Sequence, residues 1–373
     1  MLVLTGIAAC CALVGVMQQL LGMALVQRFA AASVPAPKAR PPVSVLKPLC
    51  GVEPLMEQAL ESFFLLDYPD YQLVFGVQDE ADPVLAVLER LRARYPAREV
   101  VLVVDATQHG SNRKVSNLIN MFPAARHEIL VMSDADIHVP SYFLDRVMAA
   151  LEEPGVGLVT SLYTALPGTP ALATQLGTSQ INYNFLPGAL LARKLGRQDC
   201  LGVTMALNKT VLAEIGGLQA VADHLADDQV LGRLVLARGY KLTLAQLVPA
   251  TTVPEADFTA LYRHELRWAR TIRALVPVPY AASVLQISLF WAALTVLLSG
   301  AALWSGLFFA AVLAMRVFAA RRIDAALRLP HSANWWSFLL RDSFSTLIFI
   351  ASFTGNRVDW RGQMMQADPG KLR

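Results

Sequence analysis

Charged residues are scarce in this sequence. Only 16% of its 373 residues are Asp, Glu, Lys or Arg, whereas 55% are hydrophobic, and the mean hydropathy is +0.43. An ordinary soluble protein of this length carries more charge on its surface, so we expect a membrane protein. The formal net charge is only +3. So small a charge does not indicate a basic surface that binds nucleic acid, and we expect no nucleic acid as a partner.

Cysteine is also rare. The four cysteines form no CxxC pair, and two of them, Cys10 and Cys11, lie in an apolar segment. A disulfide framework or a structural zinc site is therefore not expected.

Charge is absent altogether from two long segments, residues 1–27 and 274–315. Each exceeds the roughly 20 residues that cross a bilayer. The first lacks the basic start of a secretory signal, so we expect an uncleaved anchor. The second is long enough for two spans that turn between Ser299 and Gly306. Residues 335–354 form either a further span, which we favour, or a partly interfacial helix.

The basic residues next to these segments predict the orientation. Basic residues follow both apolar segments: Arg28, Lys38, Arg40 and Lys47 after the first, and Arg316, Arg321, Arg322 and Arg328 after the second. The positive-inside rule therefore places the middle of the chain in the cytoplasm. The basic tail fits that rule poorly if all four segments cross. We expect five parts: an N-terminal transmembrane helix (1–27), a proline-rich linker (28–42), a cytosolic domain with interfacial helices (43–273), a C-terminal membrane region of about three helices (274–356) and a tail (357–373).

The middle portion alternates between two periodicities. Apolar runs typical of strands occur at residues 43–49, 71–78, 100–104, 129–132 and 156–163. Segments of helical period separate them, and two of these segments begin with proline. This alternation predicts an α/β fold with a mostly parallel sheet and helices on both faces. Ligands of such sheets bind beyond the carboxyl ends of the strands.

Three aspartates follow strands at that edge. Asp79 follows the second predicted strand, and Asp134 and Asp136, in the sequence SDAD, follow the fourth. In an extended segment residues i and i+2 point the same way, so the last two carboxylates would repel each other. A divalent cation bound to a diphosphate relieves this repulsion. The alternative is a solvated turn.

Two further segments carry polar residues at helix starts. Lys114 and Asn117, in GSNRKVSNL, are candidates for binding a phosphate and a sugar or ribose hydroxyl; the alternative is a capped helix start. Asp227 and Asp228 open an amphipathic helix, where acidic residues are favoured by the helix dipole in any case. The functional reading makes one of them a general base.

Two segments have the character of interfacial helices. In FTALYRHELRWARTIR, His264, Arg267 and Trp268 share a helical face, and such a helix is either part of a site or an anchor for acidic lipids. Residues 180–205 mix aromatic, aliphatic and basic residues. This segment predicts an entrance for a lipid, lined by Cys200, Gly202 and Thr204; the alternative is a helix packed under the sheet.

The ordered set of Asp79, Asp134-Ala-Asp136, Asp228 and HELRW resembles the inverting glycosyltransferases of family 2, which have a GT-A nucleotide-sugar fold. The phrases KPLCGVEP, DYPDYQLVFGVQDEADP and ADDQ are most similar to the ceramide glucosyltransferase group and its bacterial relatives, the hopanoid-biosynthesis glycosyltransferases. The likeness runs from about residue 43 to the end of the chain. His264 stands where the family pattern has Gln or Arg.

The resemblance implies a role for each residue of the set. Asp79 would bind the uracil or ribose of UDP, Asp136 with Asp134 would hold Mg²⁺ or Mn²⁺, and Asp228 would be the catalytic base. Arg267 and Trp268 would close over the diphosphate. The implied partners are a UDP-sugar, a membrane lipid acceptor and the bilayer of a bacterial inner (cytoplasmic) membrane, with no obligate protein partner.

Three functions remain open at this point. The first is transfer of one sugar, N-acetylglucosamine, to a hopanoid such as bacteriohopanetetrol, with glucose and ceramide as the alternative pair. The second is a processive polysaccharide synthase, which the small number of candidate spans disfavours. The third is a catalytically silent lipid-binding or scaffold protein.

Overall fold

The computed structural model describes residues 1–33, 36–330, 334–360 and 363–366. Part of the expected linker (34–35) and most of the expected tail (361–362 and 367–373) lie outside the described residues. The chain forms two compact units. The sheet unit comprises Ser33–Gly168 and Gln198–Pro254, and the helical unit comprises Met1–Ala32, Thr169–Arg197 and Glu255–Arg373.

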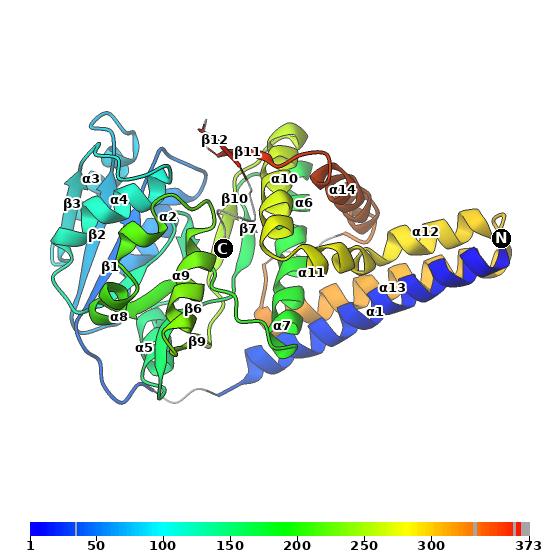
Figure 1. Ribbon diagram of the computed structural model, residues 1–373, viewed down its shortest axis with the longest axis horizontal. Coiled ribbons are helices and arrows are strands. Elements are labelled where there is room, and N and C mark those ends of the chain that lie inside the picture. The colour runs from blue at the N-terminus through cyan, green and yellow to red at the C-terminus, as the bar shows by residue number, and fades with distance from the viewer. Residues whose placement is uncertain (34–35, 331–333, 361–362, 367–373) are drawn as a thin grey trace. The chain divides into compact units, whose positions relative to one another are not determined.

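A seven-stranded sheet forms the centre of the sheet unit (Figure 1). Its spatial order is β3-β2-β1-β4-β8-β6-β9. The strands are β1 (Val43–Pro48), β2 (Tyr71–Val77), β3 (Val100–Val104), β4 (Ile129–Met132), β6 (Val156–Thr160), β8 (Met205–Asn208) and β9 (Lys241–Leu244). Only β8 runs antiparallel to its neighbours, β4 and β6. The predicted mostly parallel sheet is therefore confirmed, with one antiparallel strand that the sequence did not reveal.

Helices cover both faces of this sheet. The helices of the sheet unit are α2 (Met56–Phe64), α3 (Val84–Arg94), α4 (Arg113–Met121), α5 (Phe143–Leu151), α8 (Lys209–Glu214) and α9 (Asp227–Ala237), with short 3-10 turns at Phe122–Ala124 and Leu218–Val221. Apolar residues of α4, α8 and α9 form one core cluster with β1, β4 and β8. On the other face, the rings of Phe63 in α2 and Phe143 in α5 meet edge to face at 5.8 Å.

A smaller sheet continues from the carboxyl edge of the large one. Its order is β5-β10-β7, formed by β5 (Ile137–His138), β7 (Thr164–Pro167) and β10 (Ala250–Val253). The chain leaves β4 at Met132 and enters β5 at Ile137. The Asp134-Ala-Asp136 segment is therefore the crossing between the two sheets.

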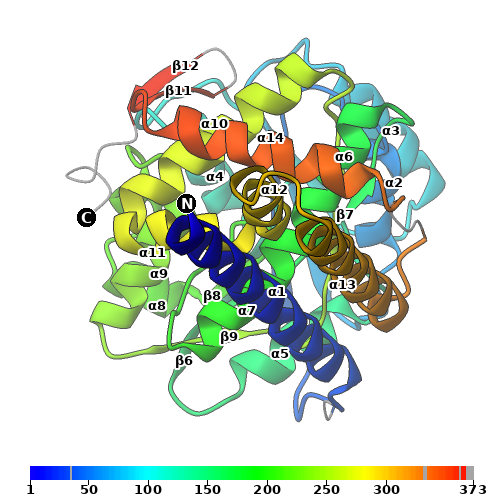
Figure 2. The ribbon, with the colours of Figure 1, turned by 90° about the vertical axis from the view of Figure 1, so that its right-hand side faces the viewer.

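The helical unit contains the two long apolar helices, α1 (Leu2–Ala31) and α13 (Leu303–Leu327), together with shorter ones. Its other described helices are α6 (Leu172–Gln180), a π-helical turn (Ile181–Phe185), α7 (Leu186–Lys194), α10 (Phe258–Leu275), α11 (Pro277–Ala282), a 3-10 turn (Ser283–Gln286), α12 (Ser288–Leu298) and α14 (Ser337–Ser352). Helix α1 packs along α12, α13 and α7 (Figure 2). Close approach to α7 depends on Gly22, where a Cβ would lie 2.7 Å from Pro187.

Among the described residues, α1 and α13 are each long and apolar enough to cross a membrane, and the bent pair Pro277–Gln286 and Ser288–Leu298 is a third candidate. The expected turn between two C-terminal spans lies between α12 and α13, where Gly300 has a φ of +66°. Helix α14 has 16 residues, fewer than the roughly 20 of a full crossing. In the tail, β11 (Arg357–Trp360) pairs antiparallel with β12 (Gln363–Gln366).

The segment 180–205, expected to be one interfacial stretch, is divided between the two units. Its first part continues α6 into α7, which packs against α1 in the helical unit. Its last part, from Gln198, belongs to the sheet unit and leads into β8.

Candidate active site

Charged side chains from three elements meet at the carboxyl edge of the large sheet. Nζ of Lys114, in the first turn of α4, lies 2.6 Å from Oδ1 of Asp134 and 3.7 Å from Oδ2 of Asp227. Asp227 opens α9. The structure therefore brings together side chains that the sequence placed in three separate segments.

Asn112 holds the starts of α4 and α9 together. It is the N-cap residue of α4: its side-chain oxygen accepts a hydrogen bond from the N–H of Val115 at 3.1 Å. Its side-chain nitrogen donates to the carbonyl oxygen of His224 at 2.8 Å and to Asp227 at 3.3 Å. A cap of this kind contributes about 1 kcal/mol to a helix. Here the same side chain also fixes Lys114 beside the acidic start of α9.

Asp134 and Asp136 do not form the extended pair that we expected. A turn at residues 135–136 separates them. Asp136 accepts a hydrogen bond from the hydroxyl group of Thr251 in β10, whereas Asp134 contacts Lys114. The chain turns here because it passes from one sheet to the other. Burial and the nearby charge of Asp134 both raise the pKa of Asp136.

Lys47 lies beneath this turn, and sequence reasoning gave it no role in the site. Its side chain is completely buried. Nζ donates to the carbonyl oxygen of Asp134 at 2.7 Å and lies 3.7 Å from the centre of the Phe63 ring. Burial lowers the pKa of Lys47 to about 7, against the opposing effect of Asp136 and Asp134. A lone lysine inside an apolar strand was the available signal.

Asp228 lies beside Gly202. Its Oδ2 accepts a hydrogen bond from the N–H of Gly202 at 2.9 Å, and its Oδ1 accepts one from the N–H of Gln229 at 2.7 Å. Burial, followed by the charge of Asp227, raises the pKa of Asp228 to about 7. A carboxylate with this pKa is suited to accept a proton near neutral pH.

Gly202 opens onto the charged cluster. A Cβ built at Gly202 would lie 3.3 Å from Oδ2 of Asp228, 3.3 Å from Nζ of Lys114 and 3.7 Å from Oδ2 of Asp134. These distances place all three charged groups around one backbone position. The absence of a side chain there leaves space next to Asp228.

The residues on either side of Gly202, Cys200 and Thr204, are buried. Cys200 is 1% exposed and packs in the core cluster against α9, where a Cβ at Gly232 would approach its own Cβ to 2.8 Å. Thr204 is completely buried, and its hydroxyl group has no hydrogen-bond partner. Both residues are therefore buried, and their role in lining an entrance for a lipid stays a prediction.

Asn117 and Asp79 have local contacts. Asn117 is 3% exposed, and its Nδ2 donates to the carbonyl oxygen of Gly76 at 2.8 Å, while its Oδ1 is buried without a partner. Asp79 is exposed beyond β2, and its Oδ1 accepts a hydrogen bond from the N–H of Ala81 at 2.9 Å. Their roles toward a nucleotide stay predictions.

The HELRW motif lies on α10, within the helical unit. Asp257 caps this helix by accepting hydrogen bonds from the N–H groups of Thr259 and Ala260. Nδ1 of His264 is bonded to Glu255, and its ring meets that of Trp268 edge to face at 4.6 Å. The other ring nitrogen, Nε2, is buried without a partner. The His264 ring is thus held at one nitrogen and available at the other.

The residues of the sheet unit fit a divalent cation for which substrate phosphates and water supply most of the ligands. In the described part of the chain, no three His, Cys, Asp or Glu side chains form a metal-binding group. Asp134 and Asp136 supply carboxylates, and burial together with the charge of Asp134 raises the pKa of Asp136. Mg²⁺ is commonly held by one or two carboxylates together with substrate phosphates and water.

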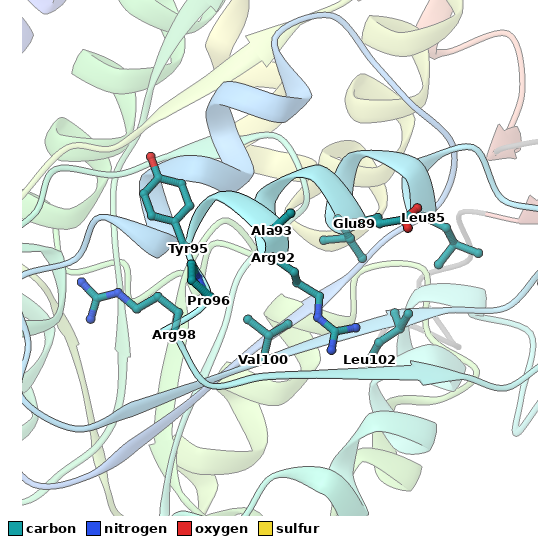
Figure 3. A pocket seen from close by; sticks show the side chains of 10 residues that line it. Leu85, Glu89, Arg92, Ala93, Tyr95, Pro96, Arg98, Val100 and Leu102 are labelled. Atoms are coloured by element: carbon teal, nitrogen blue, oxygen red, sulfur yellow. The ribbon is translucent and has the colours of Figure 1, made fainter.

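A separate hollow of about 660 Å³ lies between α3 and the edge strand β3 (Figure 3). Arg92, Val100 and Leu102 are among the residues that line it. None of the predicted site residues is among them. The hollow is therefore not part of the charged cluster.

Residues 7–373 match glycosyl transferase family 21. The protein belongs to this family. The expected ceramide glucosyltransferase-like character is confirmed, although the matching family is number 21 and the resemblance had pointed to family 2. The link to hopanoid enzymes stays a prediction.

Two curated relatives of the family 21 protein are ceramide glucosyltransferases. Ceramide glucosyltransferase 1 of Caenorhabditis elegans is 26% identical over 242 residues, which cover 64% of this chain and 51% of that protein. The ceramide glucosyltransferase of Komagataella phaffii is 28% identical over 163 residues, which cover 39% and 32%. The chain spans about half, or less, of the length of these relatives.

A solved structure shares the fold of the family 21 protein. The mannosyltransferase PcManGT from Pyrobaculum calidifontis, determined in complex with GDP-Man and Mn²⁺, superposes with a TM-score of 0.55 at 19% identity. The match covers 94% of this chain and 99% of that chain. The expected GT-A type of fold is therefore confirmed.

Proposed function

We propose that this protein is a membrane-bound inverting glycosyltransferase that moves one sugar from a UDP-sugar to the hydroxyl group of a lipid. The observation that carries this proposal is a charged cluster at the edge of the sheet where ligands bind in such folds. Lys114, Asp134 and Asp228 surround Gly202, and Asp227 lies 3.7 Å from Lys114. Family membership and the long apolar helices support a lipid acceptor. In this proposal the charged cluster lies on the cytoplasmic side of a bacterial inner membrane, as the basic residues after the apolar segments predict.

Asp228 is the catalytic base in this proposal. Two backbone N–H groups orient its carboxylate, and its pKa of about 7 lets it accept a proton at neutral pH. The lipid hydroxyl attacks the anomeric carbon as its proton passes to Asp228, while the bond from that carbon to the diphosphate breaks. Proton transfer of this kind contributes about 10²- to 10⁴-fold to the rate. One displacement inverts the anomeric centre.

The departing UDP requires positive charge. Lys114 supplies part of it, because its ammonium group lies beside Asp134 and Asp227 at the edge of the sheet where the diphosphate would bind. Asp134 and Asp136 would hold Mg²⁺ or Mn²⁺, which stabilises the negative charge of the diphosphate when bound. The motif assigns diphosphate contacts to Arg267, Trp268 and His264, and nucleoside contacts to Asp79.

The favoured substrates are UDP-N-acetylglucosamine and a hopanoid such as bacteriohopanetetrol, because the intact Asp134-Ala-Asp136 resembles the bacterial relatives. The named curated relatives favour UDP-glucose and ceramide as the second candidate pair. A processive synthase is disfavoured, since the described residues contain at most three candidate spans.

The test uses the purified full-length protein in detergent with Mn²⁺. Each radiolabelled UDP-sugar is offered with each lipid, and products are separated by thin-layer chromatography and identified by mass spectrometry. A single new glycolipid supports the proposal and names the pair. A ladder of products indicates a synthase, and no transfer from any donor indicates a silent scaffold protein.

A further inference from the structure

Helix α10 is held in the helical unit by a residue of its own motif. Glu265 lies between His264 and Arg267 in the HELRW sequence. Both of its carboxylate oxygens accept hydrogen bonds from Arg341 of α14, each at 2.7 Å. The exposed fractions of the two side chains are only 9% and 1%. The motif therefore contains a buried, two-point ion pair in addition to its candidate ligand residues.

Arg341 also binds a third helix. Its Nη1 donates to the carbonyl oxygen of Leu176 in α6 at 3.1 Å, and its Nε donates to the hydroxyl group of Ser345 at 3.2 Å. The guanidinium group lies 5.0 Å from the centre of the Phe344 ring. Helices α6, α10 and α14 therefore meet at one guanidinium group.

This contact fixes the rotation of α10 as well as its position. A guanidinium group that makes two parallel bonds to a carboxylate constrains both distance and direction. Glu265 lies on the buried face of α10 with Leu261 and Ala269. Because successive helical residues are about 100° apart, Arg267 projects from the side opposite Glu265, whereas Trp268 lies only about 60° around the helix from it. Holding Glu265 in place sets the directions in which they point.

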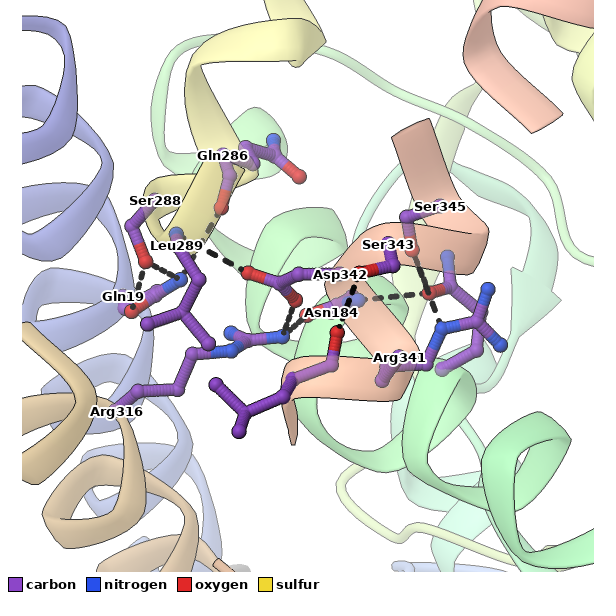
Figure 4. Close-up of polar contacts among 12 residues, drawn as sticks. Gln19, Asn184, Gln286, Ser288, Leu289, Arg316, Arg341, Asp342, Ser343 and Ser345 are labelled. Atoms are coloured by element: carbon purple, nitrogen blue, oxygen red, sulfur yellow. Dashed lines mark hydrogen bonds and ion pairs between the residues drawn. The ribbon is translucent and has the colours of Figure 1, made fainter. Parts of the chain in front are cut away.

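The next residue of α14 makes a second ion pair that does not involve α10. Asp342 accepts a hydrogen bond from Nη2 of Arg316 in α13 at 2.7 Å, and the same nitrogen donates to Asn184 at 2.8 Å (Figure 4). These side chains are also buried, with exposed fractions of 3% each for Arg316 and Asp342. The helical unit thus offers a matched control: a buried ion pair of the same type on the same helix.

We propose that Glu265 and Arg341 are positioning residues that fix the rotation of α10 and thereby the directions in which Arg267 and Trp268 project. This inference rests on the proposed function, in which Arg267 contacts the diphosphate. It deepens that function by assigning to α14 the task of orienting the motif helix. A purely structural ion pair would stabilise the helical unit without acting through Arg267.

A double-mutant cycle separates the two roles. UDP affinity by calorimetry and kcat/KM for sugar transfer are measured for wild type, E265Q, R267A and E265Q/R267A, all purified in detergent. Misplacement of a ligand residue costs about 10- to 100-fold in kcat/KM. We expect a loss of this size for E265Q alone and no further loss when E265Q is added to R267A. Losses that multiply would overturn the proposal, as would an E265Q variant with wild-type kinetics.

Two further variants keep the result interpretable. R341K retains the charge but cannot form the two-point contact, so it should reproduce the E265Q pattern even where E265Q folds poorly. D342N breaks the control pair between Asp342 and Arg316. Any loss of kcat/KM that it causes should multiply with the loss caused by R267A. If R341K also multiplies with R267A, the pair is only structural.

The binding arm distinguishes failure of this proposal from failure of the proposed function. If wild type binds UDP but transfers no sugar to any lipid, the proposed function is wrong. The double-mutant cycle can then still be evaluated from the UDP affinities of the four proteins. If R267A leaves UDP affinity unchanged, Arg267 is not a diphosphate ligand, and the positioning proposal is overturned whatever the transfer assay shows.

Discussion

Nζ of Lys114, at the start of α4, lies 2.6 Å from Oδ1 of Asp134. The carboxylate that is expected to bind a metal ion therefore already contacts an ammonium group. Burial alone would lower the pKa of Lys114, but the charges of Asp134, Asp227 and Asp228 raise it, and the side chain stays protonated. One ammonium group therefore balances several carboxylates before any substrate binds.

Replacing Lys114 tests this balance. K114M leaves the carboxylates of Asp134 and Asp227 without their cation, so the repulsion between them is no longer balanced. We expect a lower thermal unfolding midpoint that Mn²⁺ partly restores, together with weaker binding of the UDP-sugar. The control is K241M, since Lys241 lies at the exposed start of β9. Equal unfolding midpoints for K114M and wild type would contradict the assigned role.

The space at Gly202 gives a second prediction. In G202A the new methyl group would lie 3.3 Å from both Asp228 and Lys114, which is tighter than ordinary contact. We expect kcat/KM to fall by about 10- to 100-fold, because the base and its neighbours are displaced. G306A is the control, since a Cβ at Gly306 meets nothing within 4 Å. Full activity in G202A would show that the space beside Asp228 is not used.

The pH dependence follows from Asp228. Its pKa is raised to about 7 by burial and by Asp227, and a base must be deprotonated to act. We therefore expect kcat/KM to be constant above pH 7 and to fall about tenfold per pH unit below it. D227N removes the charge that raises the pKa, so the falling limb should move to lower pH. A limb at the same pH in D227N would contradict the assignment.

His264 replaces the Gln or Arg of the family 2 pattern. Glu255 holds its Nδ1, and this contact lowers the pKa of Glu255 although burial opposes it. If Nε2 contacts the diphosphate, H264A should weaken UDP binding, whereas H264Q, which restores a pattern residue, should bind nearly as well as wild type. Calorimetry with UDP makes the comparison. Equal affinities for H264A and wild type would remove His264 from the site.

Much of the fold could be predicted because its strands are short apolar runs that end in polar residues. The runs at 43–49, 100–104 and 129–132 correspond to β1, β3 and β4. Strand β8 was not found, because MALN contains only three apolar residues and none that is β-branched. The turn at residues 135–136 was considered only as the alternative to an extended pair, since it depends on the crossing into a second sheet that no local pattern encodes.

The site could be predicted in part for the same reason. Strand ends and helix starts are local features, so Lys114, Asp134 and Asp228 were found from the sequence. Partners that come from distant segments were not. Lys47 joins Asp134 across neighbouring strands, and Arg341 reaches Glu265 from α14. Only the folded structure shows which residues from distant segments contact each other.

The central claim is that Asp228 removes the proton from the acceptor hydroxyl, and D228N tests it most directly. Turnover and UDP affinity are measured side by side with the lipid and UDP-sugar that wild type uses. The account predicts that D228N loses about 10²- to 10⁴-fold in kcat while UDP affinity stays nearly unchanged. Transfer by D228N at a rate close to that of wild type, or a parallel collapse of UDP binding, would contradict it.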